Sequence, residues 1–231
     1  MKLFLRTLII AASALLPQVA FAGEVQWKFV GASSIGNGIQ CSKSSTEYSS
    51  AGNDLSLLLP QMNISMPAGA KPNIKSQWGT CFILFKVTVP QGETITTTRS
   101  TLIGGILKDK GVHGYIDAVT MLTQQKIWQT NPHIGFVPFA FGSAIHLRRN
   151  MNAFEQINEP LFEMTKSQNL SPTAKKQLCK LTFARPAELG LYIRLSVAAT
   201  RRSTSTSAII KIDSMDQHFD LSMRSEACPV N

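Results

Sequence analysis

The residues best suited to chemistry lie near the C-terminus, in the stretch DSMDQHFD at positions 213–220. On an extended strand alternate side chains share a face, which places Asp216, His218 and Asp220 together and Phe219 on the other side. Two carboxylates beside an imidazole can bind a metal ion or transfer a proton. The same pattern is also typical of the solvated outer face of a sheet. These three residues are therefore a candidate polar site and the basis of a hydrolase hypothesis.

Other catalytic and metal-binding patterns are weaker. Ser143 lies near His146 but lacks the G-x-S-x-G turn of a nucleophilic serine. Cys81 would need a free thiol to act as a nucleophile, and three other cysteines in the chain favour a disulfide bond instead. Neither Cys-x-x-Cys nor His-x-x-x-His spacing occurs. We therefore expect no metal site and no cofactor, and we assign no catalytic residue.

Two tryptophans and two arginines are candidate binding residues. Trp78 and Trp128 could each stack on a sugar ring, although single tryptophans also commonly belong to the core. Arg201 and Arg202 are expected at the tip of a hairpin within TRRSTSTS, either solvated or touching an anionic partner.

The first 22 residues predict a secretory signal peptide. Lys2 and Arg6 precede an apolar run, residues 8–16, that is too short to span a bilayer. The small-x-small pattern Ala-Phe-Ala ends at Ala22, and we expect cleavage after it. The remaining 209 residues, 23–231, can form a single domain with a substantial core. No later stretch predicts a transmembrane segment, so the protein is expected to be secreted or periplasmic.

The chain is basic. Its net charge is +9, and it is +7 once Lys2 and Arg6 are removed with the signal peptide. The charges are scattered, as is typical of a surface that only maintains solubility. A basic exported protein can also adhere to an anionic polysaccharide or an envelope surface, and these are the candidate partners. No basic stripe with interleaved aromatic residues occurs, so nucleic acid is not an expected partner.

All four cysteines lie beyond the signal peptide. They are Cys41, Cys81, Cys179 and Cys228. An even number of cysteines in an exported chain predicts two disulfide bonds. Sequence alone leaves three pairings open.

Alternating apolar and polar residues predict β-strands over much of the chain. The stretch LGLYIRLSV, residues 189–197, has apolar residues at every odd position. In CFILFKVTV, residues 81–89, Cys81 shares its face with apolar residues at 83, 85, 87 and 89, so its sulfur is expected to point into the core. The following PQGE predicts a turn.

The stretch from about 123 to 180 differs because prolines interrupt it and its apolar residues lack a period of two. AFEQINEPLFEMTKSQ (153–168) and SPTAKKQL (171–178) predict short helices, the second with Ser171 as N-cap and Pro172 at the first helical position. The sequence as a whole predicts a mostly β protein, an antiparallel β-sandwich with a partly helical excursion near 123–180.

The order of several motifs also carries a family resemblance. These motifs are GNGIQC (36–41), CFILFKVTVPQGE (81–93), a third cysteine before LGLYIRLSV (189–197), and Asp213-Ser214 before a final cysteine at 228. Together they resemble the secreted domain-of-unknown-function family number 4360, over most of the chain that follows the signal peptide. The resemblance implies an exported, four-cysteine β protein with no assigned activity. It also implies disulfide bonds between Cys41 and Cys81 and between Cys179 and Cys228.

These observations predict an exported protein with a non-enzymatic role, in binding or at the envelope surface, built on a disulfide-stabilised scaffold. Two alternatives stay open. One is a carbohydrate-binding module that uses Trp78 or Trp128 as its platform. The other is a hydrolase that uses Asp216, His218 and Asp220.

Overall fold

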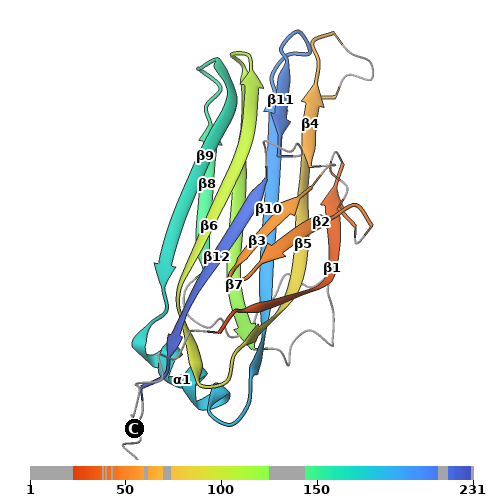
Figure 1. Cartoon of the computed structure of the whole chain (residues 1–231). Helices are drawn as coiled ribbons and strands as arrows, with labels where there is room; N and C mark the ends of the chain where they lie inside the picture. The colour runs from red at the N-terminus through yellow and green to blue at the C-terminus, as the bar shows by residue number, and fades with distance from the viewer. Residues whose placement is uncertain are drawn as a thin grey trace, which may run out of the picture.

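Strands with alternating apolar and polar side chains dominate the structure, a computed structural model that describes residues 23–37, 39, 41–42, 44–59, 62–69, 74–124, 144–212 and 218–229. Over these residues the chain forms two antiparallel sheets packed face to face, with one short helix at one end (Figure 1). The predicted mostly β sandwich is therefore confirmed.

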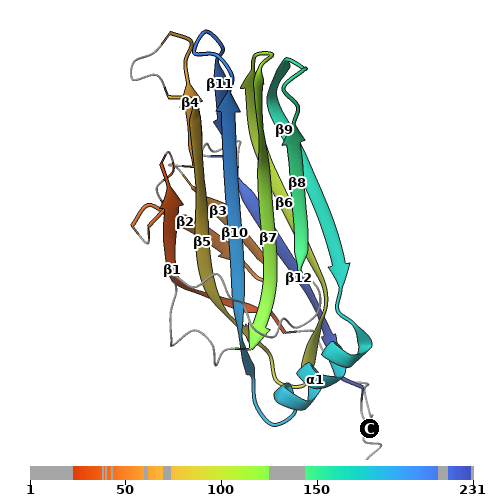
Figure 2. The same ribbon diagram turned by 180° about the vertical axis from the view of Figure 1, so that it is seen from behind.

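Sheet A has five described strands, and their order in space differs from their order in the chain. From one edge to the other they are β1 (Gln26–Gly36), β5 (Ser76–Val89), β10 (Ala187–Arg201), β7 (Val112–Gln124) and β8 (Ile145–Met151). Every neighbouring pair is antiparallel. β10, the last strand of this sheet along the chain, therefore lies at its centre, and the N-terminal strand β1 lies at one edge, as Figure 2 shows.

Sheet B is the sheet nearer the viewer in Figure 1. Its described strands run in the order β2 (Glu47–Ala51), β3 (Asp54–Leu58), β12 (Phe219–Ala227), β6 (Glu93–Lys108), β11 (Ala208–Lys211) and β4 (Asn63–Met66). A further strand, β9 (Ile157–Asn169), pairs with the opposite edge of β6. Because β12 pairs with the first part of β6 and β11 with its last four residues, these two strands follow each other along the same edge.

The core fills the space between the two sheets. In β5, Cys81 and the apolar residues at 83, 85, 87 and 89 are each 0% exposed, which confirms the face that the sequence pattern predicts. A polar contact crosses this core, because the Ser100 hydroxyl of β6 donates a hydrogen bond to Thr120 Oγ1 of β7 at 3.0 Å. Both residues are buried away from water, so each hydroxyl group relies on the other as its hydrogen-bond partner.

The segment from the end of β8 through β9 corrects one local prediction. The stretch 153–168, expected to form a short helix, instead forms the turn after β8 and most of β9. β9 pairs with β6 from Thr97 to Lys108, and this long backbone pairing outweighs the modest helical preference of its Glu, Gln and Met residues.

The helix α1 (Pro172–Thr182) begins where the sequence predicts. The Ser171 hydroxyl accepts a hydrogen bond from the Ala174 amide at 3.2 Å, and Pro172 lies in the first turn, where its missing N–H leaves no bond unmade. α1 covers the end of the sandwich at which β5 turns into β6 (Figures 1 and 2). Among the described residues, no helix combines the length and the apolar character needed to cross a membrane.

Two disulfide bonds join Cys41 to Cys81 and Cys179 to Cys228, which is the pairing that the family resemblance implies. The first attaches the connection between β1 and β2 to the inner face of β5, and the second attaches α1 to the segment that follows β12. All four cysteines are oxidised, so none is available as a nucleophile or a metal ligand.

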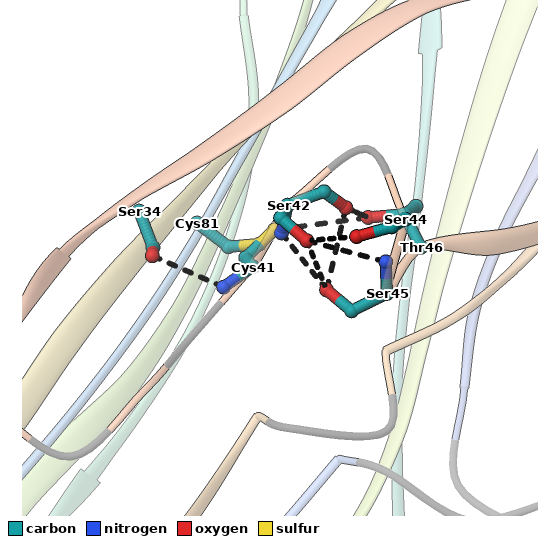
Figure 3. Close-up of a disulfide and its surroundings, with 7 residues drawn as sticks. All are labelled: Ser34, Cys41, Ser42, Ser44, Ser45, Thr46 and Cys81. Carbon is teal, nitrogen blue, oxygen red and sulfur yellow. Dashed lines mark hydrogen bonds between the residues drawn. A yellow bond between two sulfur atoms is a disulfide. The ribbon is translucent and has the colours of Figure 1, made fainter.

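Hydrogen bonds hold the chain around Cys41 (Figure 3). The Cys41 amide donates to Ser34 Oγ of β1 at 3.0 Å, and the Thr46 hydroxyl donates to the Ser42 carbonyl at 2.8 Å. Cys41 itself is 6% exposed and Cys81 is fully buried. The sulfurs therefore lie in the core, as expected for Cys81 from the alternation of its strand.

Arg201 is buried, which contradicts its predicted place on a solvated tip. Its side chain is at the end of β10, and the residue is 2% exposed. The guanidinium donates to main-chain carbonyls of two connections, those of Met66, Pro67, Ile74, Thr204 and Thr206. Arg201 therefore links the β4–β5 connection to the β10–β11 connection, which crosses from one sheet to the other rather than forming the predicted hairpin, while Arg202 stays exposed.

Candidate functional site

A groove of about 600 Å³ lies on the outer face of sheet B and is lined by five strands, β2, β3, β12, β6 and β9. Hydroxyl groups come from Ser49, Ser56, Thr97, Thr101, Ser167 and Ser222. Charged groups come from Asp54, Arg99, Asp220 and Arg224, and Ala51, Leu55 and Leu221 complete the lining. The groove is therefore mainly polar, and the alternation of each strand supplies the polar side chains.

The strand register places these side chains in rows across the sheet. Asp220 of β12 lies between Ser56 of β3 and Thr101 of β6. In the next row, Ser222 lies between Asp54 and Arg99. Leu221, the residue between these two positions of β12, is 1% exposed because its side chain faces the core. The two rows thus form a continuous polar surface over a rigid apolar support.

Two arginines lie side by side in this groove. Arg224 of β12 is paired in register with Thr97 of β6, two residues before Arg99 on the same face of that strand. Both arginines are exposed, and neither has an ion-pair partner among the described residues. They are therefore two guanidinium groups whose donors are available to a ligand.

The charges of the groove are separated across the sheet. Neighbouring strands lie about 4.8 Å apart, so the backbones of Asp54 on β3 and Arg99 on β6, with β12 between them, are about 10 Å apart. Asp54 has no ion-pair partner among the described residues. Asp54 of β3 and Arg99 of β6 therefore mark an acidic and a cationic side of the groove, and the strand between them, β12, carries one charge of each sign, Asp220 and Arg224.

The predicted polar cluster is present in part. His218 Nε2 lies 2.8 Å from Asp220 Oδ2, and the main-chain carbonyl of His218 accepts a hydrogen bond from the Ile103 amide at 2.8 Å. The other imidazole nitrogen, Nδ1, is buried without a hydrogen-bond partner in the described part of the chain. Asp216, the third predicted member, lies outside the described residues. The structure thus brings His218 and Asp220 together beside the groove, and within the described part of the chain no serine or threonine hydroxyl is bonded to the imidazole.

No metal centre is formed by the residues that the structure describes. Within them, no three His, Cys, Asp or Glu side chains lie close enough together to hold an ion.

Trp78 lies on the opposite side of the molecule from the groove. It is on β5 of sheet A, three residues before the buried Cys81, so its side chain points away from the core. Trp78 is 44% exposed, and its amide donates to Asn37 Oδ1 at 2.8 Å. It is therefore an accessible aromatic ring, but it is no part of the polar groove. Trp128, the other predicted platform, lies outside the described residues.

The main groove residues that sequence reasoning missed are Asp54, Arg99, Ser222 and Arg224. Each occupies an outward position in an alternating stretch, which was a signal that these side chains face solvent. The missing information was which strands are neighbours, because β3, β6 and β12 are far apart in the sequence.

Comparisons with known proteins show only distant likenesses. No family model and no curated protein matches the chain, and the resemblance to family number 4360 stays a prediction. One similar solved structure is the enzymatically active domain of tailspike protein 4 from bacteriophage CBA120, with 11% identity and a TM-score of 0.28 over 87% of this chain. Another is TmCBM61 in complex with β-1,4-galactotriose, with 9% identity and a TM-score of 0.25 over 87% of this chain and 88% of that one. The match spans only 19% of the tailspike chain, and at these TM-scores neither likeness carries a conclusion.

Proposed function

We propose that this protein is exported and acts as a non-enzymatic binding protein whose groove on sheet B holds an acidic polysaccharide. The observation that carries the proposal is the pair Arg99 and Arg224, two exposed guanidinium groups that lack ion-pair partners among the described residues and lie in a hydroxyl-lined groove. A ligand that matches this groove carries both hydroxyl groups and anionic groups.

The chemistry of the lining fits such a ligand. A guanidinium group presents parallel N–H donors that match the two oxygens of a carboxylate or the oxygens of a sulfate. Serine and threonine hydroxyls both donate and accept, as sugar hydroxyls do, and the carboxylate of Asp54 accepts hydrogen bonds from them. A volume of about 600 Å³ lies within the range of roughly 300–1,000 Å³ that is common for small-molecule sites.

Two features support an extracytoplasmic role, and a third supports a polyanionic ligand. The first 22 residues predict a signal peptide, and the two disulfide bonds are typical of proteins that fold in an oxidising compartment. The net charge of +7 after cleavage favours the approach of a polyanion.

Affinity electrophoresis through gels that contain a polyuronate tests this function, with a neutral polysaccharide such as dextran in parallel gels. We expect the polyuronate to retard the protein and dextran to leave its mobility unchanged. A hydrogen bond to a charged group is worth about 1.5–3 kcal/mol, so Arg99→Gln and Arg224→Gln should each raise the apparent Kd for the polyuronate at least tenfold.

Arg202→Gln is the matched control, because this exposed arginine lies in the β10–β11 connection and its replacement changes the net charge by the same amount. Its apparent Kd should stay within about twofold of the wild type, the small effect expected of a distant surface charge. Equal weakening by Arg202→Gln would show that net charge alone drives binding, and failure of the wild type to bind would also contradict the proposal.

A second candidate, a hydrolase, rests on the His218–Asp220 pair beside the same groove. A carboxylate bonded to an imidazole can orient it as a general base. Release of reducing ends from polysaccharide by the wild type, lost in His218→Gln, would favour this candidate. Absence of release by the wild type would contradict it.

A further inference from the structure

Glu93, at the start of β6, is a buried carboxylate, and one of its two oxygens has no hydrogen-bond partner among the described residues. The residue is 7% exposed, and its Oε1 accepts a hydrogen bond from the Gly23 backbone nitrogen. The second oxygen, Oε2, is buried and has no hydrogen-bond partner among the residues that the structure describes. Among the described residues, no lysine, arginine or histidine forms an ion pair with Glu93. A buried carboxylate without a cation is costly, because its charge has lost water without gaining a partner.

At position 23, which approaches Glu93, only glycine fits without displacing its neighbours. A Cβ atom on Gly23 would lie 2.8 Å from Pro90 Cγ, closer than real Cβ atoms approach other atoms, and 3.1 Å from Glu93 Oε1, close enough that the carboxylate would have to shift. The segment is also fixed on its other side, since the Ser225 hydroxyl donates to the Gly23 carbonyl at 3.3 Å and the Val25 amide donates to Asn53 Oδ1 at 2.9 Å. The Gly23 nitrogen is therefore held against the carboxylate.

Gly23 is also the residue that follows the predicted cleavage site. Hydrolysis of the Ala22–Gly23 peptide bond by a signal peptidase consumes one water, leaves a carboxylate on Ala22 and frees the amine of Gly23. An α-amino group has an ordinary pKa of about 7.7–8.0, so this amine is mostly protonated at neutral pH. One N–H donor then becomes an ammonium with three donors and a positive charge.

We propose that cleavage after Ala22 creates an α-ammonium at Gly23 that forms a buried ion pair with Glu93, so that export processing completes the fold. The ammonium supplies the cation that the carboxylate lacks, and its additional donors can satisfy Oε2. This inference goes beyond the proposed binding function and does not depend on it.

The ion pair would lie where several chain segments meet. The Thr182 hydroxyl at the end of α1 donates to the Glu93 carbonyl at 2.7 Å, and the Gly92 amide donates to the Thr182 carbonyl at 2.9 Å. The Cys228 amide donates to the Gly92 carbonyl at 2.7 Å, beside the disulfide to Cys179. Pairing of Gly23 with Glu93 would thus connect the new N-terminus to α1 and to the C-terminal segment.

Urea unfolding of four proteins tests the proposal: chains that begin at Gly23 or that retain Ala22, each with Glu93 or with the isosteric Glu93→Gln substitution. With Glu93 present, retention of Ala22 leaves a neutral amide at Gly23 and moves the ammonium one residue away, and we expect the unfolding equilibrium constant to rise at least tenfold, about 1.4 kcal/mol. In the Glu93→Gln background we expect less than a twofold change. Equal changes in the two backgrounds would overturn the ion pair.

Two further measurements keep the test decisive. N-terminal sequencing of the exported protein should give Gly23 as its first residue, and any other start would overturn the proposal. If the Glu93→Gln chains do not fold, Nα-acetylation of the chain that begins at Gly23 replaces the substitution, because it removes the charge alone. Acetylation should raise the unfolding constant at least tenfold, and an unchanged constant would overturn the proposal.

Discussion

Charged residues at the end of the sandwich opposite α1 are satisfied by neighbouring connections rather than by opposite charges. Arg201 donates to carbonyls of the β4–β5 and β10–β11 connections. Asp109, after β6, accepts hydrogen bonds from the Ser207 amide at 2.7 Å and the Ser207 hydroxyl at 2.8 Å. These contacts join the β4–β5, β6–β7 and β10–β11 connections, each of which crosses from one sheet to the other. Sequence placed Arg201 on an exposed tip because three of the carbonyls that surround it, those of Met66, Pro67 and Ile74, lie more than 100 residues away in the chain.

The Asp109 contact predicts a pH dependence of stability. The hydrogen bonds from Ser207, the amide first and the hydroxyl second, lower the pKa of the Asp109 carboxyl in the folded protein. A group with a lowered folded pKa stabilises the protein above its unfolded pKa, about 3.9, and this contribution is lost as the pH falls through the folded pKa. Asp109→Asn should therefore lose less stability than the wild type between pH 7 and about pH 3.

Urea unfolding of both proteins at the two pH values measures this difference. An equal loss of stability in wild type and Asp109→Asn would show that the carboxyl contributes nothing to the acid sensitivity.

At the scale of elements, local sequence patterns predicted helices and strands correctly where those elements depend on contacts between residues close in the chain. Ser171 and Pro172 predicted the start of α1, because a cap and a first-turn proline act within four residues. The stretch 153–168 failed because β9 owes its conformation to β6, about 60 residues earlier in the chain. Pro160 fits this strand because the pairing of β9 with β6 shifts register between Gly104 and Ile106, at Pro160, and sheets tolerate proline at such irregularities.

The hydrogen bond between Ser100 of β6 and Thr120 of β7 joins the two sheets, and its contribution to stability can be predicted. Ser100 donates to Thr120 Oγ1 inside the core, so Ser100→Ala or Thr120→Val alone leaves one buried hydroxyl without a partner. Each single substitution should lower the free energy of unfolding by about 1–3 kcal/mol. The double variant should lose clearly less than the sum of the two, because it leaves no hydroxyl unpaired.

Thr98→Val is the matched control on the same strand, because Thr98 Oγ1 is buried and already lacks a hydrogen-bond partner among the described residues. This substitution should leave the free energy of unfolding unchanged or raise it. Additive losses in the Ser100 and Thr120 variants would contradict the contact.

At the scale of the whole molecule, the two candidate binding surfaces lie on opposite faces of the sandwich. Asp220 belongs to the groove on sheet B, and Trp78 lies on the outer face of sheet A. Sequence predicted Asp220 and its neighbour His218 because Asp220 lies on β12 and His218 directly precedes this strand, so that a period of two places both on one face. It missed Arg99 and Arg224 as a pair because their proximity requires the antiparallel pairing of β6 with β12, which joins residues more than 120 positions apart.

The most direct test of the central claim is an NMR titration of the ¹⁵N-labelled protein, residues 23–231, with a short acidic oligosaccharide such as a uronate trimer. The proposed function predicts that the amide chemical-shift changes cluster on β3, β6 and β12 around Arg99 and Arg224, and that a neutral oligosaccharide of equal length gives none there. Changes that cluster around Trp78 on sheet A, or no changes on the groove at saturating ligand, would contradict it.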